Sequence, residues 1–182
     1  MKTLRTLLLT ASILLLFTPW AAAQGSLQPR DAEVEAVYGL LNGIDTAVSD
    51  AQFESVATDP VGTMLLIDSL PNVPSTMHKR IASRLAAWPD ERVAAHYEAI
   101  LADENADTLL KARAIVGMGR AFGSLKADRL EAYLFDADVQ LQLAAVEALS
   151  LSGETGVTRL KAALVGVKSD AVKVKIEKAL SR

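Results

Sequence analysis

The chain has 182 residues and a formal net charge of −3, with 51% hydrophobic and 5% aromatic residues. This composition is typical of a helical protein rich in Ala, Leu and Val, and it excludes a disordered chain. The lack of cysteine excludes disulfides and a lipidated N-terminal cysteine, so packing alone must hold the fold together.

Residues 1–23 have the pattern of a secretory signal peptide. Lys2 and Arg5 precede an apolar run from Leu7 to Phe17, and Ala21 to Ala23 form a small-residue cleavage site. A membrane-spanning helix needs about 20 apolar residues, which disfavours an uncleaved anchor but leaves that alternative open. We therefore expect an exported protein, periplasmic or secreted, that is soluble and has no stable membrane span after cleavage.

Residues 24–74 predict irregular N-terminal helices. Apolar residues at helical spacing run from Asp31 to Asn42. Ser49 and Gln52 have the three-residue spacing of a capping box, which predicts a short second helix. Asp59-Pro60 predicts the start of a third, because proline at the first helical position loses no hydrogen bond.

Residues 75–182 contain one short pattern that returns at a fixed spacing. A pair of residues opens a helix, and a small-plus-apolar pair follows seven and eight positions later. The last three copies are 31 residues apart, and a looser copy lies 33 residues upstream of them. The opening pairs are Met77-His78, Leu110-Lys111, Leu141-Gln142 and Val172-Lys173. Such a period predicts a helical repeat array.

The pattern predicts helices in antiparallel pairs across this region, and no segment alternates at period two for long. We therefore predict an all-α fold of about ten helices, stacked as a helical-repeat solenoid. Ser75, Asp107, Asp138 and Asp170 are the predicted N-caps. The predicted helices after residue 107 are Thr108–Phe122, Ser124–Phe135, Val139–Leu151, Val157–Val167 and a capping helix, Ala171–Ser181.

Asp138 to Leu149, read as D-V-Q-L-Q-L-A-A-V-E-A-L, resembles the HEAT-like repeats of the phycobilisome-lyase type. The resemblance covers roughly residues 75–182 and implies stacked helix pairs. The family expects Arg at a slot that holds Gln142 here, so a ladder of Asp–Arg pairs between repeats would be weakest there. The family includes scaffolds, adaptors and a few enzymes, so the resemblance predicts architecture rather than activity.

No residues in the chain have the spacing of a catalytic, cofactor or metal site, and none is predicted. The two histidines are isolated; His78 is expected at a stacking interface and His96 in solvent. The glycine run that begins at Gly117 lacks the spacing of a dinucleotide loop. Gly117 is expected where two helices approach closely, and Gly123 at a helix C-terminus.

Charge is unevenly distributed along the sequence. Residues 24–60 contain seven acids against Arg30, a net of −6, whereas residues 159–182 contain seven bases against two acids, a net of +5. In a solenoid, sequence order is spatial order, so opposite ends would have opposite charge. Ordinary solvated helix faces would give the same pattern, and this alternative stays open.

In the family that the chain resembles, the second helix of each pair lines the concave surface. The side chains left over from the buried stripe there are mostly basic, and coincidence among exposed residues remains an alternative explanation. This predicted basic ridge consists of Arg92, His96, Lys126, Arg129, Arg159 and Lys161. Such a ridge would attract an acidic peptide or protein. No basic and aromatic residues interleave as in a nucleic-acid groove, so no nucleic-acid partner is expected.

The sequence therefore predicts an exported, non-enzymatic helical-repeat module for protein–protein interaction or scaffolding in the cell envelope. A regulatory subunit that self-associates through its oppositely charged ends is one alternative. A lyase- or isomerase-like enzyme of the HEAT-like family is another, supported by the resemblance alone.

Overall fold

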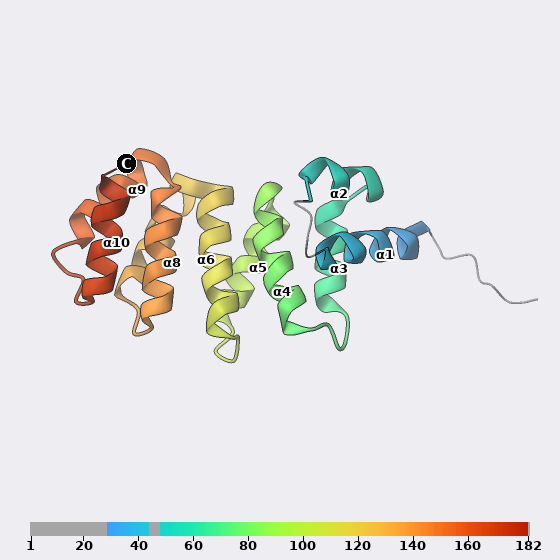
Figure 1. Cartoon of the computed structure of the whole chain (residues 1–182), viewed down its shortest axis with the longest axis horizontal. Helices are drawn as coiled ribbons and strands as arrows, with labels where there is room; N and C mark the ends of the chain where they lie inside the picture. Colours follow the sequence, from blue (N-terminus) through green and yellow to red (C-terminus); the bar gives the residue numbers. More distant parts are fainter. Residues whose placement is uncertain (1–28, 44–47, 182) are drawn as a thin grey trace, which may run out of the picture.

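The computed structural model describes residues 29–43 and 48–181. Within these ranges the chain is all-α, with ten α-helices, three 3-10 helices and no strand, so the all-α part of the predicted fold class is confirmed. Figure 1 shows the helices following one another along a row, with α1, α2 and α3 at one end and α10 at the other. The predicted signal peptide, residues 1–23, lies outside the described residues.

Three short helices form the N-terminal part, as the sequence predicts. They are α1 (Pro29–Asn42), α2 (Asp50–Val56) and α3 (Pro60–Ser69). Gln52 Oε1 accepts the backbone N–H of Ser49 at 2.8 Å, as the predicted capping box requires. Asp59 caps α3, because its Oδ1 accepts the N–H of Gly62 at 3.0 Å.

The middle of the chain begins with α4, which continues into the 3-10 turn η1. These elements are α4 (Ser75–Arg84), η1 (Leu85–Ala87), α5 (Glu91–Ala102) and α6 (Thr108–Phe122). Pro74, whose backbone is extended, is the N-cap of α4. Ser75 was predicted to be the N-cap but is the first residue of the helix. Asp107 caps α6 as predicted, and α6 ends at Gly123, whose φ of +46° favours glycine.

The C-terminal part differs from the prediction at three helices. Its elements are η2 (Gly123–Lys126), α7 (Ala127–Ala132), η3 (Tyr133–Phe135), α8 (Val139–Ser150), α9 (Gly153–Ala163) and α10 (Asp170–Leu180). The segment predicted as one helix from Ser124 to Phe135 is a short α-helix between two 3-10 turns. The helix α9 begins at Gly153, four residues before its predicted start. The N-cap of α10 is Ser169 rather than Asp170.

The first helices of the successive pairs form one layer. Within it, α6 packs against α4 and α8, and α8 packs against α10 (Figure 1). The second helices pack behind this layer, α5 against α6 and α9 against α8. At the N-terminal end, α1 packs on α3 and also contacts α4. We call the outer surface of α4, α6, α8 and α10 the first-helix face.

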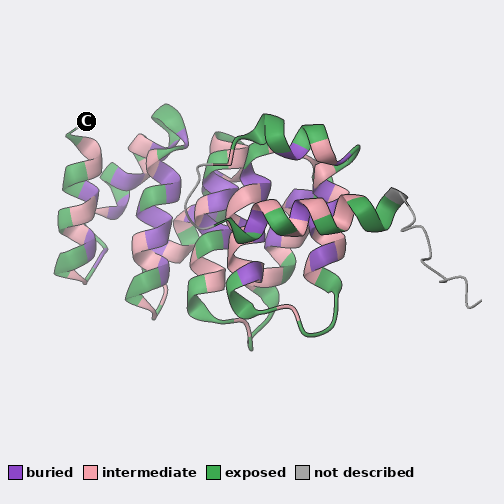
Figure 2. Cartoon of the chain, turned by 45° about the vertical axis from the view of Figure 1, so that its right-hand side comes forward, coloured by how far each residue is buried: buried purple, intermediate pink, exposed green. Residues whose placement is uncertain are grey.

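The core lies between the two layers. Figure 2 shows buried residues on the inward sides of the helices along the described chain. Tyr97 of α5, Met118 of α6, Leu130 of α7, Leu149 of α8 and Ile176 of α10 are all fully buried. Within each helix, buried apolar residues recur at helical spacing, so each helix has one apolar side. The opposite sides of the helices form the surfaces described below.

Candidate binding site

The residues of the predicted basic ridge all lie on or beside the second helices. Arg92 and His96 are on α5, Lys126 ends η2, Arg129 is on α7, and Arg159 and Lys161 are on α9. The structure therefore places them in the layer where the sequence analysis expected them. Their surroundings, however, differ from the solvated ridge that was predicted.

Arg92 lies between the N-caps of two helices. Its Nη1 and Nη2 donate to the two carboxylate oxygens of Asp59 at 2.5 and 3.1 Å. Its Nε and Nη2 donate to Oδ2 of Asp90, the N-cap of α5, at 3.0 and 2.7 Å. The hydrogen bonds from Arg92, together with that from Gly62, hold the pKa of Asp59 below its ordinary value. Arg92 thus binds the carboxylates of both Asp59 and Asp90.

The cations near α7 and α9 are paired in the same manner. Glu98 of α5 accepts from Lys126 at 3.3 Å and from Arg129 at 3.2 Å. Arg159 of α9 forms ion pairs with Asp128 and Glu131, both on α7. Each carboxylate in these pairs comes from the second helix that precedes the cation along the row.

Apart from Arg92 and Asp90, which are two positions apart, the partners in these pairs are 28 to 33 residues apart in the sequence, close to the 31-residue period. The ion pairs therefore form a ladder that joins successive second helices. It offsets the positive charge of Arg92, Lys126, Arg129 and Arg159. Lys161 is exposed and has no ion pair among the described residues.

His96 is largely buried, contrary to the expectation that it would be solvated. Its side chain is 14% exposed, and its Nε2 lies 3.8 Å from Oδ2 of Asp68 on α3. The other oxygen of Asp68 is 2.7 Å from Nδ1 of His78 on α4. Burial lowers the pKa of His96; Asp68 opposes this effect and His78 adds to it. His78 thus lies at a helix-packing interface, as predicted.

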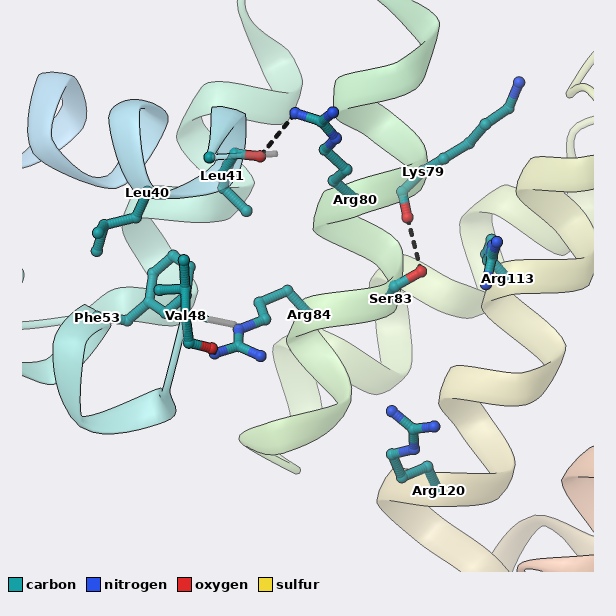
Figure 3. A pocket seen from close by; sticks show the side chains of 11 residues that line it. Leu40, Leu41, Val48, Phe53, Lys79, Arg80, Ser83, Arg84, Arg113 and Arg120 are labelled. Atoms are coloured by element: carbon teal, nitrogen blue, oxygen red, sulfur yellow. Dashed lines mark hydrogen bonds between the residues drawn. The ribbon is translucent and has the colours of Figure 1, made fainter. Parts of the chain in front are cut away.

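A different group of cations surrounds a pocket at the corner between the N-terminal helices and the first-helix face (Figure 3). The pocket has a volume of about 430 Å³. Its wall on the α1 and α2 side is apolar, with Leu40, Leu41, Val48 and Phe53. Its other wall has no carboxylate among the described residues and contains five cations: Lys79, Arg80, Arg84, Arg113 and Arg120. We call this the arginine pocket.

The three cations from α4 have partners. Lys79 pairs with Asp107 at 3.3 Å. Arg80 donates to the backbone oxygen of Leu41 at 2.8 Å, a contact drawn in Figure 3. Arg84 pairs with Asp50 at 3.1 Å, and its guanidinium lies 4.7 Å from the centre of the Phe53 ring. The contacts of Arg80 and Arg84 attach α4 to the N-terminal helices, and that of Lys79 attaches it to the N-cap of α6.

The two cations from α6 have no such partners. Arg113 and Arg120 are exposed, and neither forms an ion pair or a hydrogen bond with another described residue. They are seven positions apart, so they lie on the same side of α6 about 10.5 Å from each other. Their guanidinium groups are available to an anionic ligand, and the fork of each suits a carboxylate.

The arginine pocket was not predicted, because the predicted binding surface lies on the second helices alone. A usable signal was present, since Arg80 and Arg84 have i, i+4 spacing and Arg113 and Arg120 have i, i+7 spacing on predicted first helices. That spacing places each pair on one helix side. The apolar wall had no local signal, because it depends on how α1 and α2 fold back onto α4.

Comparisons of the chain with family models, with curated proteins and with solved structures give no match. Among the described residues, no group of three or more His, Asp or Glu side chains is arranged to hold a metal ion. None of the helices within residues 29–43 and 48–181 is long and apolar enough to cross a bilayer.

Proposed function

We propose that the chain is a helical-repeat module whose first-helix face binds an acidic segment of a protein partner. In this proposal the stacked pairs are a HEAT-like solenoid. The 31-residue period and the ion pairs 28 to 33 residues apart support that description, because equivalent positions of neighbouring repeats are then in contact. The role is non-enzymatic, and the partner is a protein or a peptide.

The observation that carries the proposal is the pair Arg113 and Arg120 beside the arginine pocket. Among the residues that the structure describes, their wall brings five cations together without one carboxylate, in a chain whose net charge is −3. An exposed ion pair contributes at most about 1 kcal/mol. Several such contacts along one segment give a modest affinity, an association rate that depends on salt, and a preference for acidic sequences.

The predicted basic ridge supports binding less well than the arginine pocket. A ligand carboxylate at Arg92 would have to displace Asp59 or Asp90, which are already hydrogen-bonded to it. The gain would then be only the difference between two similar contacts. A ligand carboxylate at Arg113 or Arg120 displaces only water, because neither arginine is paired with another described residue.

The signal-like pattern of residues 1–23 supports export, and the proposed place of action is the cell envelope or the medium. An extended acidic segment of about ten residues spans about 33 Å. That length is sufficient to cross several packed helices, which lie 8–10 Å apart on average. The repeat architecture thus fits an extended ligand.

The test uses a fluorescein-labelled peptide of about ten residues made of glutamate, glycine and one central alanine. Fluorescence anisotropy gives its dissociation constant at low and high ionic strength. We expect the double variant Arg113→Glu, Arg120→Glu to weaken binding about tenfold or more, because two attractive contacts become repulsive. The matched control, Lys161→Glu with Lys168→Glu, changes net charge equally at two exposed lysines away from the pocket.

Equal loss in both variants would mean that net charge, not the arginine pocket, governs binding. Weaker peptide binding by the control variant alone would mean that the binding site is at Lys161, in the second-helix layer. Absence of binding by the native chain at low ionic strength would contradict the proposal itself. Circular dichroism of each variant confirms that its helices are intact.

Self-association through the ends is a second candidate function. The acidic helices α1 to α3 and the basic helix α10 lie at opposite ends of the row (Figure 1). Glu35 on α1 and Lys178 on α10 are both exposed. A head-to-tail contact of this kind predicts a mass that rises with concentration at low ionic strength and returns to the monomer at high ionic strength.

A further inference from the structure

A second cavity on the first-helix face lies next to the arginine pocket. It is between α8 and α10, has a volume of about 670 Å³, and shares Arg120 with the arginine pocket. Its lining is mostly apolar: Leu143, Val146, Leu151, Ala171, Val174 and Ala179. We call it the apolar groove.

The sequence of α10 explains why the groove is open. Ala171, Lys175 and Ala179 are four residues apart, so they follow one side of the helix, and two of the three are small. On the neighbouring turn Val174 is 62% exposed, and across the groove Leu151 is 47% exposed. Apolar surface is thus left in contact with water at a hollow, where a ligand side chain could cover it.

The rim of the groove favours a negatively charged ligand. It contains Arg120, Lys175 and Lys178, and Glu147 is its one carboxylate among the described residues. Glu147 pairs with Lys175 at 3.3 Å, so these two charges offset each other. Arg120 and Lys178 are exposed and have no ion pair with any described residue. An occupant with one apolar side chain and flanking carboxylates matches both the floor and the rim.

We propose that the apolar groove binds a large apolar side chain of the same acidic segment whose carboxylates bind Arg113 and Arg120. The inference rests on the proposed function and specifies its ligand further. Arg113 lies about 10.5 Å from Arg120 along α6. About three extended residues cover that distance. The two carboxylates of the ligand are therefore about three positions apart, and its apolar residue follows the carboxylate that binds Arg120, because Arg120 lines both cavities.

The experiment compares the alanine-containing acidic peptide described above with a peptide in which leucine replaces that alanine. Burial of the leucine side chain in the groove should lower the dissociation constant about tenfold relative to alanine. The variant Val174→Ser should reduce this preference for leucine at least threefold. Val165→Ser is the matched control, since Val165 is 95% exposed and does not line the groove.

The outcomes separate the two proposals. Equal affinity for the two peptides, with salt dependence and sensitivity to Arg113→Glu retained, would overturn the apolar groove while the acidic site stands. Preference for leucine that survives Val174→Ser unchanged would also overturn it, because the side chain would then bind elsewhere. Binding of neither peptide would contradict the proposed function and the inference together.

Discussion

A Cβ atom on Gly117 would lie only 2.5 Å from the hydroxyl oxygen of Tyr97. Tyr97 is fully buried, and its hydroxyl donates to the backbone oxygen of Ala82 at 2.8 Å. The tyrosine therefore links α4 to α5, while the glycine lets α6 pack directly on it. Tyr97 is held by its backbone at one end and by the hydrogen bond of its hydroxyl at the other. A small movement of its side chain therefore cannot make room for a Cβ atom at Gly117.

We expect Gly117→Ala to destabilise the fold by about 1–3 kcal/mol, because the added methyl overpacks the interface of three helices. Chemical denaturation monitored by circular dichroism measures the change. Gly39→Ala is the matched control, since nothing lies within 4 Å of a Cβ there and Gly39 is inside α1. It should be neutral or stabilising by up to about 1 kcal/mol, through helix propensity alone. Equal effects of the two substitutions would contradict the close approach.

Leu149→Asp tests the register of the repeat pattern. Leu149 of α8 is fully buried, and an unpaired carboxylate there should cost about 4 kcal/mol or more. Thermal denaturation should find most of the variant unfolded or strongly destabilised. Leu151→Asp, two residues on at a 47% exposed position, is expected to change stability by less than about 1 kcal/mol. Unaltered thermal stability of Leu149→Asp would show that α8 does not face the core as described.

The all-α fold and most helix limits followed from the sequence, because apolar spacing and capping residues are local signals. The range predicted for α6, Thr108 to Phe122, agrees with the structure, since Asp107 and Gly123 mark its two ends. The segment from Ser124 to Phe135 was less predictable. Its apolar spacing fits one helix, and the two 3-10 turns that flank α7 have no distinctive residue pattern.

The candidate site was less predictable than the fold because it depends on tertiary contacts. Arg80 donates to Leu41, 39 residues earlier, and no local pattern encodes that contact. The ion-pair ladder was, in contrast, accessible from the period. Glu98 and Arg129 are 31 residues apart, so equivalent positions with opposite charge predict a pair between neighbouring second helices.

Asp59 has two roles, which substitutions can separate. It caps α3 and it pairs with Arg92. Asp59→Ala removes both and should cost about 1 kcal/mol or more, mainly through the cap. Asp59→Asn keeps a capping oxygen and should cost less, because an exposed ion pair contributes little. Urea denaturation at neutral pH gives both values, and an equal loss for asparagine and alanine would mean that the ion pair dominates.

The Asp59–Arg92 ion pair also predicts how the stability of the fold changes with pH. Because the pKa of Asp59 is lowered in the folded state, its contribution to stability is present above the ordinary carboxyl pKa of 3.8 and is lost as the pH falls below it. Arg92→Ala should raise the pKa of Asp59 toward its ordinary value. Carboxyl chemical shifts measured by NMR during acid titration follow this change. An unmoved titration in Arg92→Ala would contradict the contacts between the two side chains.

His96 should make the stability of the fold fall between pH 7.5 and 5.5. Its pKa in the folded state is below the ordinary 6.5, chiefly because of burial, so the unfolded chain binds the proton first. Stability from this group is therefore fully present above about pH 6.5 and is lost as the pH decreases, by at most about 1.4 kcal/mol over this range. The charged groups that face His96 are Asp68 on α3 and His78 on α4.

Substitution separates the two histidines, which are the only ones in the chain. His96→Gln should flatten the decrease in unfolding free energy, measured by urea denaturation at pH 7.5 and 5.5. His78→Gln should retain most of it, because the burial of His96 against α3 remains and burial is the largest cause of its lowered pKa. If His96→Gln kept the full decrease, the proton would be taken up elsewhere. Were His78→Gln to remove it instead, the burial of His96 would not be the cause of the decrease.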